Sequence, residues 1–185
     1  MRIIAGSLKN RSIAAPKGLN TRPTSSKVRG ALFNICQNYV ADARFLDLFA
    51  GSGAMGIEAL SRGASHAVFI DDNPASCRCI QSNLKALSIE SRGEILCRDA
   101  VSALKWLQKK NMQFDIVYID PPYQKFHVES LLTPFKESLL APDGILFLEE
   151  GAGPLPNFPF SGFEQLSQRE YGKTVLYQLK KEMIP

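Results

Sequence analysis

Residues 46–56 read LDLFAGSGAMG, an apolar run that ends in three closely spaced glycines. The segment from Ile57 to Leu60 has the composition of a helix, so the pattern predicts a strand, a tight turn and a helix start. Glycine suits such a turn because it has no Cβ, which lets the backbone turn sharply and approach a ligand closely. The free N–H groups at the start of the helix would then face an electron-rich group of that ligand.

The spacing Gly51-x-Gly53-x-x-Gly56 also fits the fingerprint of a dinucleotide-binding loop. Asp71 follows at about the distance, roughly 20 residues, at which such folds place a ribose-binding carboxylate. The loop alone therefore leaves three interpretations open: a nicotinamide or flavin enzyme, a protein with another nucleoside-containing cofactor, and an ordinary glycine-rich turn.

The composition indicates one soluble globular domain, because 45% of the 185 residues are hydrophobic and 22% are charged. No apolar run approaches the roughly 20 residues that a membrane span needs, and no apolar region follows Arg2 as in a signal peptide. The four cysteines form no C-x-x-C pair and have no zinc spacing with His66 or His127. We therefore expect a cytoplasmic protein with reduced thiols, no metal and no membrane contact.

The net charge of +4 is unevenly distributed along the chain. No acidic residue precedes Asp42, whereas seven basic residues do. These are Arg2, Lys9, Arg11, Lys17, Arg22, Lys27 and Arg29. Unopposed positive charge of this kind favours a phosphate backbone as the partner.

Residues 1–41 also carry signals of structure, which argue against a merely solvated tail. Met1–Ala5 and Ser12–Ala15 are predicted to pair as a short hairpin. Thr24 or Ser25 is then placed to cap a helix. The apolar face of that helix includes Val28, Leu32, Phe33, Ile35 and Cys36. We interpret this part of the chain as a basic extension, a hairpin followed by a helix, that docks RNA.

From Asp42 onward, strand-like and helix-like segments alternate. The expected strands are residues 44–48, 67–70, 94–97, 114–119 and 144–148, and a C-terminal antiparallel hairpin is expected from residues 163–169 and 173–180. The expected helices are residues 54–61, one through Cys79 and Leu87, one through residues 101–107, and residues 128–140 with a break at Pro134. The prediction is a Rossmann-like α/β fold, with a mostly parallel seven-stranded sheet and residues 42–185 as its core.

Asp120-Pro121-Pro122-Tyr123 directly follows the apolar run of residues 116–119, where an open α/β sheet binds its ligands. The prolines stiffen the loop and fix the direction of its carbonyl oxygens. Asp120 and the Pro121 carbonyl would form a pair of acceptors, and Tyr123 would offer a flat stacking surface. This arrangement suits an exocyclic amino group on a planar base.

With these motifs, the chain resembles the S-adenosylmethionine-dependent amino-methyltransferases that carry a D-P-P-Y signature. Within them it is most similar to the bacterial 16S rRNA guanine-N2 methyltransferase family of the RsmD type. The similar residues extend over almost the whole chain: Arg2–Gly6, Thr21–Thr24, Val28–Arg29, Ala31–Asn34, Leu46–Gly56, Leu60–Ala64 and Asp120–Tyr123.

The resemblance implies a Rossmann-like methyltransferase fold with S-adenosyl-L-methionine as the cofactor. The implied target is guanine 966 of 16S ribosomal RNA, in the small ribosomal subunit or an assembly intermediate. Nothing in the sequence argues for a partner face, so we expect a monomer.

The resemblance also implies roles for individual residues. Asp120 and the Pro121 carbonyl would hold the guanine N2 amino group, on which Tyr123 would stack the base. The implied cofactor contacts are Asp47, Gly51 and Gly53 to the methionine end, Asp71 to the ribose, and Asp99 with Ala100 to the adenine. The residues expected to contact RNA phosphates are Arg11, Arg22, Lys27 and Arg29.

The chain departs from the family pattern in two places. Ser26 and Gly30 stand in the first helix where the family usually has acidic residues, which bears on docking and not on the chemistry. Asp71 stands where the family often has Glu, so its carboxylate reaches less far, and Asp72 could share the ribose role.

Four alternatives differ in the features they explain. A nicotinamide dehydrogenase would not need the D-P-P-Y loop, and it would normally need more chain for its substrate. A DNA adenine-N6 methyltransferase shares both motifs but usually has a target-recognition region for which this chain has no room. A glutamine-N5 protein methyltransferase typically has Asn in place of Asp120. A ribosome-binding module without catalysis would explain only the basic N-terminal residues.

Overall fold

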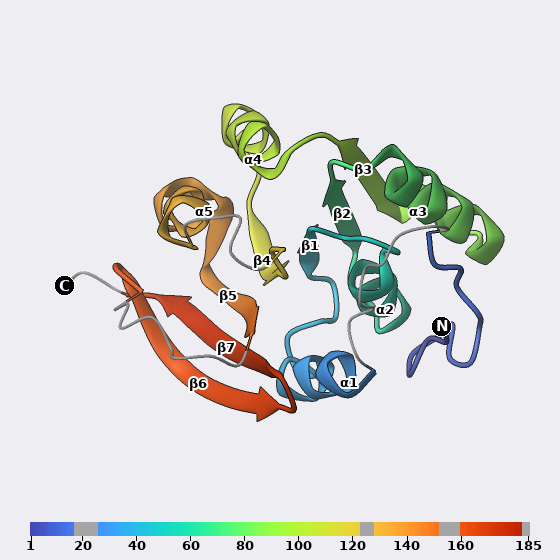
Figure 1. Cartoon of the computed structure of the whole chain (residues 1–185), viewed down its shortest axis with the longest axis horizontal. Coiled ribbons are helices and arrows are strands. Elements are labelled where there is room, and N and C mark those ends of the chain that lie inside the picture. The colour runs from blue at the N-terminus through green and yellow to red at the C-terminus, as the bar shows by residue number, and fades with distance from the viewer. Residues whose placement is uncertain (17–25, 123–127, 152–159, 183–185) are drawn as a thin grey trace.

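The computed structural model of the chain describes residues 1–16, 26–122, 128–151 and 160–182. In this part of the chain, strands form one sheet of seven in the order β3-β2-β1-β4-β5-β7-β6 (Figure 1). The five strands β1 to β5 pair in parallel, and β7 is antiparallel to both β5 and β6. The predicted mostly parallel sheet with a C-terminal antiparallel hairpin is therefore confirmed.

The strands are β1 Arg44–Leu48, β2 His66–Asp71, β3 Gly93–Cys97, β4 Phe114–Ile119, β5 Leu140–Gly151, β6 Phe163–Tyr171 and β7 Thr174–Lys181. The α-helices are α1 Ser26–Ile35, α2 Ala54–Ser61, α3 Pro74–Leu87, α4 Ala100–Lys109 and α5 Val128–Pro134. A 3₁₀ turn, η1, covers Glu90–Arg92, and a π-helical turn, η2, covers Phe135–Leu139.

Helices cover both faces of the sheet, with α1, α2 and α3 on one side and α4 and α5 on the other (Figure 1). Successive side chains of a strand point to opposite faces, which divides the core into two clusters. Phe45 of β1 packs in the cluster with α1, α2 and α3, whereas its neighbour Leu46 packs with α4 and α5. The inner strands are apolar on both faces for this reason.

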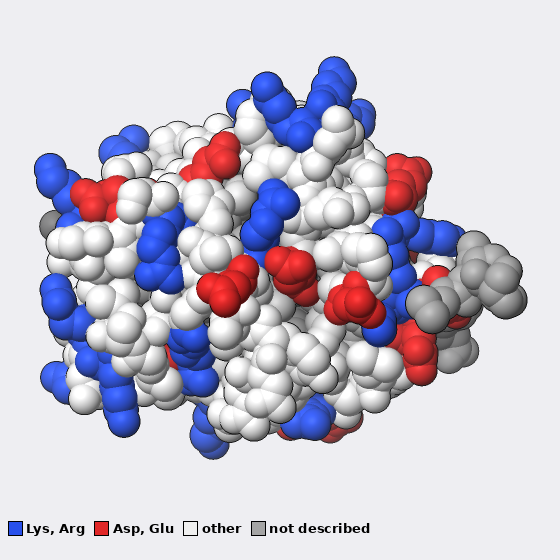
Figure 2. Space-filling model, turned by 180° about the vertical axis from the view of Figure 1, so that it is seen from behind, with Lys and Arg blue, Asp and Glu red and all other residues white. Residues whose placement is uncertain are grey.

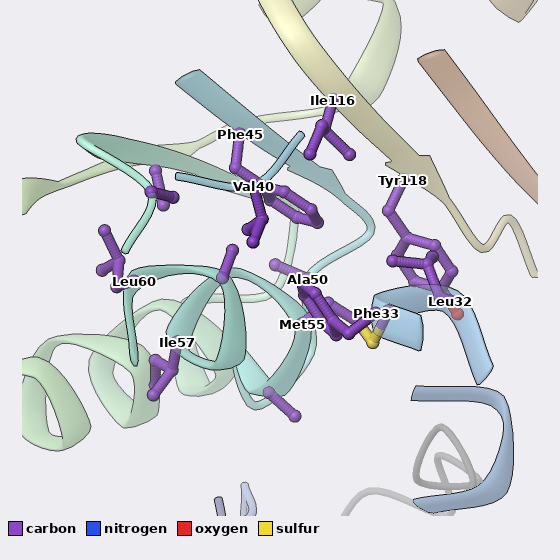
Figure 3. Packing of buried hydrophobic residues seen from close by; sticks show 14 of the residues in the cluster. Leu32, Phe33, Val40, Phe45, Ala50, Met55, Ile57, Leu60, Ile116 and Tyr118 are labelled. Carbon is purple, nitrogen blue, oxygen red and sulfur yellow. The ribbon is translucent and has the colours of Figure 1, made fainter. Parts of the chain in front are cut away.

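The N-terminal segment packs into the first of these clusters. Arg2 and Ser12 form an isolated antiparallel bridge, so the predicted hairpin is present but shorter than expected. Ile3 and Ile13 are buried with the apolar face of α1. Figure 3 shows Leu32 and Phe33 of α1 beside Met55 and Tyr118, and the Phe33 ring stacks on that of Phe45 at 5.9 Å between centroids.

Two features of the C-terminal half differ from the sequence-based expectation. Strand β5 begins at Leu140 and not at Gly144, because Leu140 already pairs with Phe114. A bulge then absorbs the turn-like residues 141–144 before Ile145 pairs with Ile116. The break expected at Pro134 is confirmed, because α5 ends there and the π-helical turn follows.

Candidate active site

The glycine loop between β1 and α2 has the conformation that its glycines allow. Gly51 and Gly53 have positive φ angles of 55° and 77°, which L-residues with a Cβ rarely adopt. The Ala50 N–H donates to the Ile70 carbonyl at 2.9 Å, and the Gly53 N–H donates to the Ala50 carbonyl at 2.7 Å. A Cβ at Gly51 would meet no atom within 4 Å, so a ligand can approach the backbone there.

Asp47 on β1 is hydrogen-bonded to the start of α2, next to the glycine loop. Its side chain is only 1% exposed, and Oδ2 accepts the Gly56 N–H at 2.9 Å. Burial raises the pKa of Asp47 to about 8, the hydrogen bond from Gly56 acts against this shift, and the charges of Asp120 and Asp71 add to it. Three of the predicted site carboxylates thus lie within electrostatic range of one another.

Asp71, at the end of β2, connects the glycine loop to the next loop of the sheet. Its Oδ2 accepts the Gly51 N–H at 2.8 Å, and its Oδ1 accepts the Asn73 N–H at 2.9 Å. Burial raises the pKa of Asp71, while these two hydrogen bonds lower it. Asp71 is half-buried and its neighbour Asp72 is exposed, so both carboxylates can be reached from the surface.

Asp99 and Ala100 follow β3 at the same edge of the sheet. Asp99 is the N-cap of α4, and its Oδ1 accepts the Ser102 N–H at 2.9 Å. This hydrogen bond lowers the pKa of the exposed Asp99 carboxyl. Ala100 is buried at the start of α4.

Asp120 and Pro121 lie beside the glycine loop, at the end of the neighbouring strand β4. The Asp120 N–H faces the Leu48 carbonyl at 3.4 Å, next to the pair formed by Leu48 and Ile119. Pro121 is buried, which fixes the direction of the backbone at this point. Tyr123 lies outside the described residues. Because β3, β2, β1 and β4 are neighbours and run in parallel, the predicted cofactor residues and Asp120 all lie at the carboxyl ends of these strands.

The basic residues that were predicted to contact RNA differ in how exposed they are. Arg11 and Lys27 are exposed, and the Arg11 side chain donates to the Ala86 carbonyl at 3.1 Å. Arg22 lies outside the described residues. Figure 2 shows basic side chains spread over the back of the molecule, with several acidic side chains between them.

The prediction of a phosphate contact for Arg29 needs correction. The side chain is only 3% exposed and donates to the Arg2 carbonyl at 2.6 Å. Lys27 and Arg29 are two positions apart on α1, and residues at this spacing point to different sides of a helix. Burial lowers the pKa of Arg29, and the nearby charge of Glu58 acts in the opposite direction.

Two buried polar side chains that were not predicted from the sequence attach the N-terminal segment to the core. Glu58 on α2 is fully buried and accepts the N–H groups of Ile4 and Ala5 at 2.8 and 3.0 Å. Asn83 on α3 is 4% exposed and bonds both Ala14 and the glycine loop. A glutamate in the otherwise small and apolar segment 54–61 was a signal for Glu58, whereas no local pattern marked Asn83.

Within the described part of the chain, no three His, Cys, Asp or Glu side chains are grouped as metal ligands would be. No described helix is long and apolar enough to cross a membrane. All described cysteines are free thiols.

Comparison with known proteins places this architecture in a family. A family model described as conserved hypothetical protein 95 matches residues 1–180. Ribosomal RNA small subunit methyltransferase D of Escherichia coli K12 is 33% identical over 161 residues, which are 86% of this chain and 79% of that protein. YlbH of Bacillus subtilis 168, provisionally named as an rRNA methyltransferase, is 41% identical over 150 residues, 80% of this chain and 82% of that protein.

The fold gives the same result. A solved structure of the Escherichia coli protein yhhF, provisionally described as a methyltransferase, has a TM-score of 0.86 and 31% identity over 98% of both chains. The predicted Rossmann-like methyltransferase fold is thereby confirmed. The chain therefore belongs to the conserved hypothetical protein 95 family, the family of the RsmD-type rRNA methyltransferases.

Proposed function

We propose that this protein transfers a methyl group from S-adenosyl-L-methionine to the N2 amine of a guanine in small-subunit ribosomal RNA, at guanine 966 of the 16S molecule. The proposal is supported by the relatives named as rRNA methyltransferases. The single observation that carries the chemistry is the position of Asp120 and Pro121 on the strand beside the glycine loop. The enzyme acts as a cytoplasmic monomer on the small subunit or its assembly intermediate.

The residues at the sheet edge fit this cofactor. The open backbone at Gly51, next to Gly53, suits the methionine carboxylate, which N–H groups at a helix start bind well. Asp47 stabilises this loop from below and faces the methionine end, Asp71 accepts the ribose hydroxyls, and Asp99 with Ala100 borders the adenine. When bound, the cofactor supplies an activated methyl group on a positively charged sulfonium, and the C–S bond breaks so that the sulfur leaves as a neutral thioether.

Asp120 and the Pro121 carbonyl activate the amine that receives the methyl group. The lone pair of guanine N2 is delocalised into the ring, which makes the free amine a poor nucleophile. Two acceptors that hold its N–H groups draw the nitrogen towards tetrahedral geometry, and these hydrogen bonds strengthen as the transition state forms. Tyr123 stacks on the base once it has left its own stack, which aligns the amine with the methyl group.

The proposal predicts a large loss of methyl transfer in Asp120→Ala. Labelled S-adenosylmethionine is incubated with small subunits from cells that lack the gene, and the modified nucleoside is identified by mass spectrometry after digestion of the RNA. We expect N2-methylguanosine with the wild type and a rate at least about 100-fold lower with Asp120→Ala, because a transition-state acceptor is lost.

Asp115→Ala is the matched control for this experiment. Asp115 is an exposed residue near the opposite end of β4, where its Oδ2 accepts the Arg44 N–H at 2.7 Å. It should retain the wild-type rate. Methyladenosine as the product would instead assign the enzyme to the adenine-N6 class, and no transfer to RNA would refute the proposed function. Sequencing of the methylated fragment tests whether the modified base is guanine 966. A parallel reaction with free 16S RNA tests whether the enzyme needs an assembled particle.

A further inference from the structure

Asn83 connects two segments that the proposed function uses for different tasks. Its Oδ1 accepts the Ala14 N–H at 2.8 Å, and its Nδ2 donates to the Ala14 carbonyl at 3.1 Å. The same Nδ2 donates at 3.1 Å to the carbonyl of Ser52, which lies between Gly51 and Gly53 in the glycine loop, called the cofactor loop from here on. One buried amide group thus binds the N-terminal segment and the cofactor loop together.

The hydrogen-bonding groups of the Asn83 amide are nearly all used by these contacts. A primary amide has two N–H donors and one carbonyl acceptor, and here they satisfy both backbone groups of Ala14 and the loop carbonyl. With Ala14 it reproduces the paired hydrogen bonds of a strand partner. Ser52 and Ala14 lie 31 and 69 residues from Asn83 in sequence, so the link depends on the folded structure.

The link lies among the basic residues of the N-terminal segment, three positions after Arg11. Only Ala15 and Pro16 separate Ala14 from Lys17, the next basic residue in the chain. Ala14 is therefore a point at which RNA bound to the neighbouring basic residues would act, through Asn83, on the glycine loop. The same segment is also attached at Glu58 and Ser61 on α2, and at the Ala86 carbonyl on α3, which accepts from Arg11.

We propose that Asn83 is a positioning residue that couples docking of RNA on the N-terminal segment to the conformation of the cofactor loop. This inference rests on the proposed function, because it requires both an RNA substrate and S-adenosylmethionine. RNA that holds the N-terminal segment in place also holds Asn83 against Ser52, which favours the loop conformation that binds the cofactor. By linkage, the cofactor strengthens RNA binding by the same factor.

The test compares affinities for S-adenosylhomocysteine, which binds as the product without reaction. Its Kd is measured by calorimetry with the full chain, alone and with saturating unmethylated small subunits. For the wild type we expect tighter binding with subunits by about 5-fold or more, at the lower end of typical coupling between sites. In Asn83→Ala this ratio should fall to about one.

A second variant and a matched control separate coupling from general damage. Asn83→Asp keeps the shape and an acceptor for the Ala14 N–H but loses both donors, so its ratio should also fall to about one. Ser61→Ala removes the hydroxyl that donates to the Ala5 carbonyl at 2.6 Å and accepts the Leu8 N–H at 3.0 Å. It weakens the attachment of the same segment without touching the loop, and it should keep the wild-type ratio.

The outcomes distinguish the inference from the function on which it rests. A wild-type enzyme that methylates the subunit but has a ratio of one overturns the coupling and leaves the function intact. A wild-type ratio in both Asn83 variants also overturns it, as does an equal loss of the ratio in Ser61→Ala. If the wild type transfers no methyl group to RNA, the proposed function fails, and the inference fails with it.

Discussion

At the scale of single residues, the buried carboxylate of Asp47 makes the stability of the protein depend on pH. Its pKa is raised from 3.8 to about 8, chiefly by burial. The folded state therefore keeps a proton between pH 4 and 8 that the unfolded chain has already released. Because the folded state binds more protons in this range, the free energy of unfolding falls as the pH rises from about 4 to 8.

Asp47→Asn should remove much of this dependence, because the amide stays neutral and its oxygen can still accept the Gly56 N–H. Between pH 4 and 8, urea unfolding of the variant should show a fall in free energy smaller than that of the wild type by at least about 1 kcal/mol. Asp143→Asn, at an exposed carboxylate, serves as the control. The same slope for Asp47→Asn and the wild type would show that Asp47 is ionised in the folded state.

At the scale of elements, α2 can approach β2 closely only because residue 56 has no side chain. A Cβ at Gly56 would lie 2.3 Å from Cε1 of Phe69, so the ring or the helix would have to move. We expect Gly56→Ala to lower the free energy of unfolding by about 1–3 kcal/mol, despite the better helix propensity of alanine. Chemical denaturation measures this loss.

Gly30→Ala is the matched control, since it makes the same change in the interior of α1. A Cβ there would meet only Cδ1 of Ile4, at 4.0 Å, an ordinary contact. The variant should be more stable than the wild type by up to about 1 kcal/mol, the helix preference of alanine over glycine. Equal effects of the two substitutions would contradict the packing argument.

The attachment of the N-terminal segment to α2 depends on the charge of Glu58. Its carboxylate accepts two backbone N–H groups and the Arg62 Nε at 2.8 Å, and lies 3.7 Å from the Arg29 Nε. Glu58→Gln replaces one of the two acceptor oxygens by an NH₂ group, so buried N–H donors lose their acceptor. It also leaves the buried Arg29 guanidinium without this counter-charge. We expect a loss of about 3–5 kcal/mol in the free energy of unfolding by urea.

Glu129→Gln, at an exposed glutamate of α5, is the control and should unfold at the wild-type urea concentration. If Glu58→Gln also unfolds at the wild-type urea concentration, the Glu58 carboxylate does not hold the N-terminal segment.

The elements were predictable from sequence where the signal is local. The ends of β1, β4 and α2 agree with the prediction because apolar runs and glycines mark them directly. The roles of Glu58, Arg29 and Asn83 were not predictable in this way, because they depend on partners 27 to 69 residues away in sequence. A basic residue in a basic segment suggests surface charge, and only the packing of α1 turns Arg29 inward.

At the scale of the whole molecule, the charge asymmetry of the chain sets how its affinity for RNA depends on salt. Each phosphate contact releases counterions, which gives a slope of about −0.7 to −0.9 per contact in a plot of log affinity against log salt. Arg11→Ala combined with Lys27→Ala removes two exposed charges from the segment that has no acidic residue before Asp42. The slope for small-subunit RNA should become shallower by about 1 to 2 units.

Lys105→Ala combined with Lys109→Ala makes the same change in net charge on the exposed side of α4, outside the N-terminal segment. If RNA docks on that segment, this control keeps the wild-type slope, as measured by filter binding over a series of salt concentrations. Equal losses in the two double variants would mean that net charge alone attracts the RNA, with no preferred docking surface. A loss confined to the Arg11 and Lys27 variant places the phosphate backbone along the N-terminal segment, next to the residues that Asn83 holds against the cofactor loop.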